Sequence, residues 1–389
     1  MRIRIAAGMM AGLALLAGCA AAPAASPTTP TTASATSTPT PTPTVDPIAD
    51  LSLAQRVGQL FMVGTGTDAP NPQTLADIAD RHVGGIFLHS GTASSVAQTA
   101  AVVARFTALV SPAATGDVPL WVATDQEGGD VQVLHGPGFA RMPSALTQGT
   151  RAPETLRADA ASWAAELAAA GVNVNLAPVA DIVTSAATAR QNPPIGALDR
   201  QYGYDQQTVA AHAGGFADGM RHGGVMPTFK HFPGLGRART NTDFVLTTDT
   251  TVTAGSPDVQ VYRALLAAGP ALVMAATAIY QKIDPSAPAA FSPKIITGLL
   301  RGTLGFDGVV ITDDLSAAAA VAGWTPAQRA LLAIGAGCDI VLVSSEVSVL
   351  PEMYDAVLSA AQSDPGFAAK VDAAARRVVT AKQAGPGAD

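Results

Sequence analysis

Four short polar stretches carry the side chains that could do chemistry, and each lies at the end of an apolar run. They are residues 125–129 (DQEGG), Asp181, residues 230–234 (KHFPG) and residues 312–316 (TDDLS). Carboxylates accept hydrogen bonds from hydroxyl groups, and lysine and histidine side chains donate hydrogen bonds to oxygen atoms. If the four stretches meet, they form a cleft for a polar, uncharged ligand such as a sugar.

Eight apolar, β-rich runs would supply the strands that position these stretches. The runs are 57–64, 83–89, 119–125, 172–180, 225–232, 271–280, 308–313 and 339–344, and the clearest helical stretches are 92–111, 154–170, 205–222, 325–335, 347–362 and 366–383. Strands that alternate with helices predict a parallel sheet, and eight such units predict an α/β fold of the (β/α)8 TIM-barrel type. An open doubly wound sheet is the alternative, but no GxGxxG motif follows a strand. In a barrel all carboxyl ends of the strands lie on one face, which is where active sites lie.

Each polar residue also has an ordinary structural explanation. Lys230 and His231 could form a surface pair, and Gly128 and Gly129 could simply make a turn. An aspartate at the end of a strand often caps the next helix, and this is the expectation for Asp314. The four stretches together favour a functional cleft.

The N-terminus predicts an export signal followed by a tether. In residues 1–18, two arginines precede an apolar run that is short for a bilayer span, as in a signal peptide. Residues 16–19 (LAGC) resemble a bacterial lipobox, which makes Cys19 the lipidated N-terminus. An ordinary signal peptide or an uncleaved anchor is the alternative. Residues 19–46 are expected to be a disordered tether, because residues 20–44 contain only Ala, Pro, Ser and Thr. Residues 47–389 would then form one barrel domain.

The composition excludes several classes of protein. The 389 residues are 48% hydrophobic and 14% charged with a net charge of −7, which argues against a disordered chain and against a nucleic-acid partner. Two cysteines exclude a disulfide scaffold, and Cys338 is expected to be a buried, inert thiol. The six histidines include no HExxH motif, so no metal site is predicted.

Three motifs, in this order, resemble glycoside hydrolase family 3, in its single-domain β-N-acetylhexosaminidase branch. They are DQEGG at 125–129, KHFPGLG at 230–236 and GFDGVVITDDLS at 305–316, and the likeness spans about 50–345. The resemblance implies a TIM barrel, a retaining mechanism and no cofactor. It makes Asp313 the nucleophile and places four residues on the sugar, namely Asp125, Arg200, Lys230 and His231. The alternative for Arg200 is a surface ion pair with Asp199 or a neighbour.

The chain departs from the family at the general acid/base. The family uses a histidine in the loop after KHFPG, but no histidine follows His231 in this chain. Asp243 occupies the matching position and is the predicted acid/base, with Asn241 as a tentative orienting neighbour. Asp249 is the second candidate for this role.

Two expectations concern the charge state of these carboxyl groups. Lys230 is expected to lower the pKa of Asp313 and keep it ionised. Arg237 and Arg239 would lower the pKa of Asp243 unless they point away from it.

Together these features predict a retaining exo-glycosidase that removes terminal β-N-acetylglucosamine from peptidoglycan-type cell-wall fragments. It would form a covalent glycosyl-aspartate and would lie outside the cytoplasm, held to the membrane by the lipid on Cys19. The alternatives are a β-glucosidase or β-xylosidase, a phosphorolytic variant, or a lipoprotein that binds glycans without turnover. The exact glycan and the oligomeric state are left open.

Overall fold

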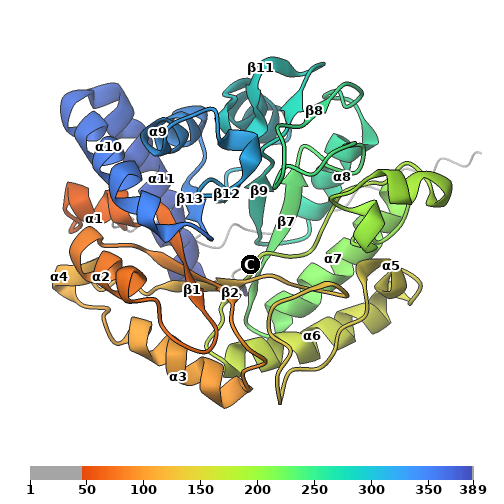
Figure 1. Ribbon diagram of the computed structural model, residues 1–389, viewed down its shortest axis with the longest axis horizontal. Coiled ribbons are helices and arrows are strands. Elements are labelled where there is room, and N and C mark those ends of the chain that lie inside the picture. Colours follow the sequence, from red (N-terminus) through yellow and green to blue (C-terminus); the bar gives the residue numbers. More distant parts are fainter. Residues whose placement is uncertain (1–45, 388–389) are drawn as a thin grey trace, which may run out of the picture. The chain divides into compact units, whose positions relative to one another are not determined.

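Eight parallel strands close into a barrel in the computed structural model, which describes residues 46–387 (Figure 1). Neighbours around the barrel follow chain order, and the last strand pairs with the first. The predicted TIM barrel is therefore confirmed. Its strands are β1 (Phe61–Gly66), β2 (Gly85–Ser90), β3 (Trp121–Thr124), β6 (Val174–Asn175), β7 (Met226–Phe232), β9 (Leu272–Ala275), β12 (Val310–Asp314) and β13 (Ile340–Val343).

Helices surround the barrel (Figure 1). The longer ones are α2 (Pro72–Arg81), α3 (Val96–Thr107), α6 (Pro153–Ala169), α7 (Gln206–His222), α8 (Pro257–Leu266), the π-helix η4 (Lys294–Thr303), α9 (Pro326–Ala336), α10 (Leu350–Ser363) and α11 (Pro365–Ala384). Short helices are α1 (Leu53–Gly58), α4 (Pro112–Thr115) and α5 (Ala145–Gln148), and 3-10 turns are η1 (Ala186–Gln191), η2 (Gly196–Leu198), η3 (Ala289–Phe291), η5 (Ala319–Val321) and η6 (Val347–Val349). Many begin with a Ser, Thr, Asn or Asp whose side chain accepts from a backbone N–H of the first turn.

Several predicted strands are shorter in the structure, and two of them have a clear local reason. Residues 57–58 belong to α1, because Ser52 and Gln55 form a capping box that starts a helix there. Strand β6 ends at Asn175, and Pro178, which has no N–H to donate, lies within the predicted run 172–180.

Long loops above the barrel carry two small sheets. One joins β8 (Thr248–Asp249), β10 (Ile279–Tyr280) and β11 (Asp284–Pro288), and the other is the hairpin of β4 (Gln126–Gly128) and β5 (Val131–Gln132). Both follow the carboxyl ends of barrel strands, so they build up the face where the predicted site residues lie.

Two apolar layers hold the fold together. The inner one fills the barrel with side chains such as Met62, Trp121 and Ile311, and the outer one packs strands against helices. Cys338 belongs to the outer layer, so its expected burial is confirmed, and burial raises the pKa of its thiol.

Lys382, near the end of α11, lies at the foot of the barrel. Its Nζ donates to Gln59 Oε1 at 2.6 Å and to the Gly84 carbonyl at 2.7 Å, and it lies 5.6 Å from the centre of the Trp121 ring. Within residues 46–387 it forms no ion pair, and burial lowers its pKa to about 7.

The predicted signal peptide (1–18), Cys19 and all but the last residue of the predicted tether lie outside the described residues. Asp46, the first described residue, already forms an ion pair with Arg376 of α11. Between residues 46 and 387 the structure contains no helix with the length and apolar character of a membrane span.

Candidate active site

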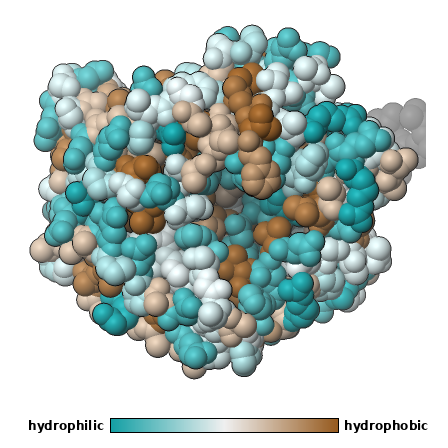
Figure 2. All heavy atoms as spheres, viewed as in Figure 1, coloured by the Kyte–Doolittle hydropathy of each residue, from teal (hydrophilic) through white to brown (hydrophobic). Residues whose placement is uncertain are grey.

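A cleft of about 510 Å³ opens at the carboxyl ends of the barrel strands. Figure 2 shows a hollow near the middle of the visible face, with hydrophobic side chains on parts of its rim. Its lining includes every predicted barrel residue of the site, namely Asp125, Arg200, Lys230, His231, Asn241, Asp243 and Asp313. The structure therefore brings these residues together. Asp125, Lys230, His231 and Asp313 come from strand ends, whereas Arg200, Asn241 and Asp243 come from loops.

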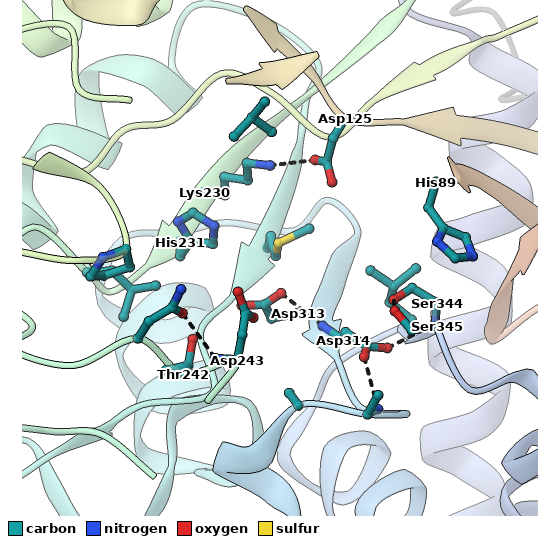
Figure 3. A pocket seen from close by; sticks show the side chains of 18 of the residues that line it. His89, Asp125, Lys230, His231, Thr242, Asp243, Asp313, Asp314, Ser344 and Ser345 are labelled. Atoms are coloured by element: carbon teal, nitrogen blue, oxygen red, sulfur yellow. Dashed lines mark hydrogen bonds and ion pairs between the residues drawn. The ribbon is translucent and has the colours of Figure 1, made fainter. Parts of the chain in front are cut away.

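Asp313 is the last residue but one of strand β12 and is partly buried at the base of this cleft (Figure 3). Burial raises the pKa of its carboxyl above the usual value, and the negative charge of Asp243 raises it further. His231 and, to a smaller extent, Lys230 act in the opposite direction. Lys230 thus lowers the pKa of Asp313 as expected, but the net shift is upward because burial outweighs this effect.

Lys230 lies at the centre of a buried ionic network. Its Nζ is 2.6 Å from Asp125 Oδ1 and 2.6 Å from Glu127 Oε1. Burial alone would lower the pKa of Lys230, but the two carboxylates raise it above the ordinary value, so the ammonium stays charged. Lys230 is thus a fixed cation of the cleft and not half of a surface pair.

Glu127 connects this lysine to Arg200. The guanidinium donates from Nε and Nη2 to the two Glu127 oxygens at 2.8 and 2.7 Å, a bidentate pair. Although burial acts in the opposite direction, Arg200 and Lys230 lower the pKa of Glu127 to about 2. Arg200 is therefore not paired with Asp199. The sequence showed Glu127 inside the DQEGG motif, but nothing in the motif predicted its partners.

His231 is oriented by Asp181 from the end of the preceding barrel unit. Asp181 Oδ2 lies 2.7 Å from His231 Nδ1, and its Oδ1 accepts from the backbone N–H groups of His231 and Leu235. A carboxylate can only accept here, so Nδ1 carries the proton and Nε2 is free to act in the cleft. The sequence places Asp181 at the end of a predicted strand. Its contact with His231 depends on the fold and was not predicted.

Asp243 lies in the loop after β7, exposed on the rim of the cleft and beside Asp313 (Figure 3). Asn241 Oδ1 accepts from the backbone N–H of Asp243 at 3.0 Å, so it shapes the loop and does not hold the carboxylate. The Asp243 and Thr242 carbonyls accept from the N–H groups of Ala319 and Ala320, which follow strand β12. Main-chain bonds thus tie this loop to the segment after Asp313.

The two neighbouring arginines point away from Asp243. Arg237 pairs with Asp258 at 3.0 Å, and Arg239 donates to Gln191 at 2.9 Å. Both line a separate cavity of about 280 Å³, together with Asp249. Asp249 Oδ1 accepts from the N–H groups of Thr251 and Val252, so this carboxylate is used in a turn. Asp243 is thus the candidate acid/base that shares a cleft with Asp313.

Three further polar residues line the cleft, and the sequence analysis did not single them out. They are His89 at the end of β2 and Ser344 and Ser345 directly after β13. His89 ends one predicted strand and Ser344 another, so the strand-end rule could have found both. Asp314 accepts from the N–H groups of Ser316, Ala317 and Ser344, which makes it a turn-forming residue and not a helix cap.

Among residues 46–387 no three His, Cys, Asp or Glu side chains converge in the manner of metal ligands. The cleft instead offers Asp313 at its base and Asp243 on its rim, with Asp125, Lys230 and Arg200 along one wall. This arrangement suits attack on, and proton transfer to, an uncharged substrate.

Residues 52–381 match the glycosyl hydrolase family 3 N-terminal domain. The chain belongs to this family. It is a glycosyl hydrolase, and its relatives include a β-hexosaminidase of Thioalkalivibrio sulfidiphilus, 34% identical over 72% of this chain and 78% of that protein. The β-hexosaminidase LpqI of Mycobacterium tuberculosis is 33% identical over 87% of this chain and 84% of that protein. The crystal structure of a β-N-acetylhexosaminidase from Beutenbergia cavernae is 57% identical, covers 86% of this chain and 99% of its own, and superposes with a TM-score of 0.85.

Proposed function

We propose that this family 3 hydrolase is a retaining exo-β-N-acetylglucosaminidase that removes terminal sugars from peptidoglycan-type fragments. The observation that carries the proposal is that Asp313 and Asp243 share one cleft with Lys230 and His231, which are held by the buried carboxylates of Glu127 and Asp181. The names of the related proteins support the choice of sugar.

The reaction needs one carboxylate that attacks and one group that transfers a proton. In the first step Asp313 attacks the anomeric carbon while Asp243 protonates the departing glycosidic oxygen, which leaves a glycosyl-aspartate. In the second step Asp243 takes a proton from water, and the water displaces Asp313. Two inversions at one carbon retain its configuration.

The remaining polar residues hold the sugar during these steps. Asp125 accepts hydrogen bonds from hydroxyl groups, and Lys230 donates to them while Glu127 and Asp125 fix its position. Arg200 acts on the cleft mainly by fixing Glu127. Because Lys230 and Arg200 are neutralised by two carboxylates, this wall suits a neutral sugar and not an anion.

We also propose that the protein works outside the cytoplasm, tethered through a lipid on Cys19. The support is the LAGC sequence at 16–19 and the Ala/Pro/Ser/Thr segment after it. Replacing Cys19 with serine should release the protein from the membrane fraction while its hydrolase activity persists.

The test of the activity uses an aryl β-N-acetylglucosaminide. The variant Asp313→Ala should release no aryl alcohol, whereas the matched control Asp130→Asn, an exposed residue after the DQEGG motif, should retain wild-type activity. A fluorinated substrate analogue should leave a covalent adduct on Asp313, visible by mass spectrometry. Full activity of Asp313→Ala would contradict the proposal.

The same assay separates the alternatives. A β-glucosidase or β-xylosidase would show the larger kcat/KM on its own aryl glycoside. A phosphorolytic enzyme would form a sugar 1-phosphate when phosphate is added, and a pure binder would hold the sugar without turnover. For the acid role, Asp243→Asn should lose much activity with a poor leaving group and little with an activated one.

A further inference from the structure

One wall of the cleft is not used by the steps described above. It consists of His89, Ser344 and Ser345, and we call it the His89 wall. Its elements β13, β1 and β2 are consecutive around the barrel, opposite β6 and β7. In Figure 3 these residues lie on the other side of Asp313 from Asp243 and His231. A sugar held by Lys230 and His231 along one edge must therefore turn another edge toward the His89 wall.

The wall has free hydrogen-bonding capacity. Within residues 46–387 neither ring nitrogen of His89 has a hydrogen-bond partner, and the Ser344 and Ser345 hydroxyls bond only each other, at 3.3 Å. The His89 ring is nevertheless held in place, because it stacks on Phe87 with 5.7 Å between ring centres and an angle of 7°. The half-buried imidazole lines the cleft, so its ring nitrogens are available to a ligand there.

The backbone leaves room for this ring. A side chain at Gly64 of β1 would come within 2.9 Å of the His89 ring and 1.9 Å of the Ser344 carbonyl oxygen. Gly64 thus lets the His89 ring and the Ser344 backbone, which belong to two of the three residues of the wall, lie close together. The imidazole and the hydroxyls lie together because the strand between them carries no side chain at that point.

The chemistry of the wall matches an amide. Burial lowers the pKa of His89, so the neutral imidazole offers one hydrogen-bond donor and one acceptor. Each serine hydroxyl can also donate one hydrogen bond and accept others. An acetamido group likewise has one N–H donor and one carbonyl acceptor. Phe87 and Leu342 line the same cleft and supply apolar surface for a methyl group. A carboxylate would fit poorly, because Asp314 and Asp125 are near the imidazole.

The position of the wall selects one substituent of the sugar. Asp314, the neighbour of the nucleophile, accepts from the Ser344 N–H at 2.9 Å, so the wall begins next to the attacked carbon. That carbon has two ring neighbours, C2, which carries one substituent, and the ring oxygen, beyond which C5 carries the hydroxymethyl group. The acetamido group has separate donor and acceptor atoms and a methyl group, so it uses more of the wall than the single hydroxyl of the hydroxymethyl group does. We propose that His89, with Ser344 and Ser345, binds the 2-acetamido group of the terminal sugar and determines the preference for it over a 2-hydroxyl group.

This inference rests on the proposed function, and the test separates the two. The substrates are 4-nitrophenyl N-acetyl-β-glucosaminide and 4-nitrophenyl β-glucoside, which share a leaving group and differ at C2. In His89→Phe the stacked ring remains and its hydrogen bonds are lost, so kcat/KM should fall roughly tenfold for the first substrate and change little for the second. His89→Gln, which can still donate and accept, should retain more of the preference.

The control is His135→Ala, an exposed histidine outside the cleft, which should change neither substrate. Binding is measured separately by calorimetry on the Asp313→Asn protein, where free N-acetylglucosamine should bind more tightly than glucose and His89→Phe should remove the difference. Equal losses on both substrates, or an unchanged preference in both assays, would overturn the role of the His89 wall. A wild-type enzyme that prefers the glucoside would overturn the proposed function as well.

Discussion

At the scale of single residues, the pKa of Asp313 depends on its burial and on neighbouring charges. The sequence indicated the neighbours but not the size of either effect. A strand-end aspartate beside a lysine predicts a lowered pKa, whereas the structure gives a raised one because the carboxyl is buried. Burial and distance depend on the fold, so they are not visible in a motif. The same reason explains why Glu127, Asp181 and His89 were not given roles, although all three lie in or beside predicted strand ends.

The negative charge of Asp243 is one cause of the raised pKa of Asp313. Replacing Asp243 with asparagine removes this charge, so the pKa of Asp313 should fall and the nucleophile should remain ionised at lower pH. The acidic limb of the kcat/KM profile, measured with an activated aryl leaving group, should therefore move to lower pH. Asp130→Asn is the control, and the acidic limb of its kcat/KM profile should lie at the same pH as in the wild type. A shift to higher pH in Asp243→Asn would refute this coupling.

At the scale of the elements, the barrel was predictable because each strand is an apolar run of the right length. All eight runs overlap the observed barrel strands. Among the longer helices, α2, α8 and η4 were not predicted. Helix α8 contains Val259, Val261 and Tyr262, which have modest helix propensity, and these side chains are buried. Its formation therefore depends on packing, which a local pattern does not show.

The seam between β1 and β13 provides an element-scale prediction. Gly64→Ala would place a methyl group 1.9 Å from the Ser344 carbonyl oxygen, so the strands must separate. We expect the free energy of unfolding to fall by about 1–3 kcal/mol in urea titrations, with a loss of activity because the His89 wall shifts.

Gly255→Ala is the matched control, since no atom lies within 4 Å of its added carbon. It should leave both stability and activity nearly unchanged. Equal stability of Gly64→Ala and wild type would show that the seam is looser than the structure indicates.

At the scale of the whole molecule, helix α11 packs at the foot of the barrel and places Lys382 there. Among residues 46–387 this lysine forms no ion pair. The pKa of Lys382 is about 7 in the folded protein and about 10.4 in an unfolded chain. Between these values the unfolded chain binds more protons, so stability should rise as the pH increases from 7 toward 10. Below pH 7 both states are protonated and the cost of burying the charge is fully present.

Lys382→Met should therefore raise the free energy of unfolding at pH 7, by about 1–3 kcal/mol, and should flatten its rise between pH 7 and 9. Urea titrations at several pH values measure both effects. Lys370→Met, an exposed position on the same helix, is the control and should keep the wild-type slope. An identical slope in Lys382→Met and wild type would disprove the role of this lysine.

The main-chain bonds from Ala319 and Ala320 to the loop of Asp243 have a consequence for substitutions in this loop. They fix the place of residue 243 without using its side chain. A substitution at this position should therefore leave the path of the loop unchanged. If Asp243 has the proposed proton-transfer role, Asp243→His should keep the loop in place and change only the group that transfers the proton.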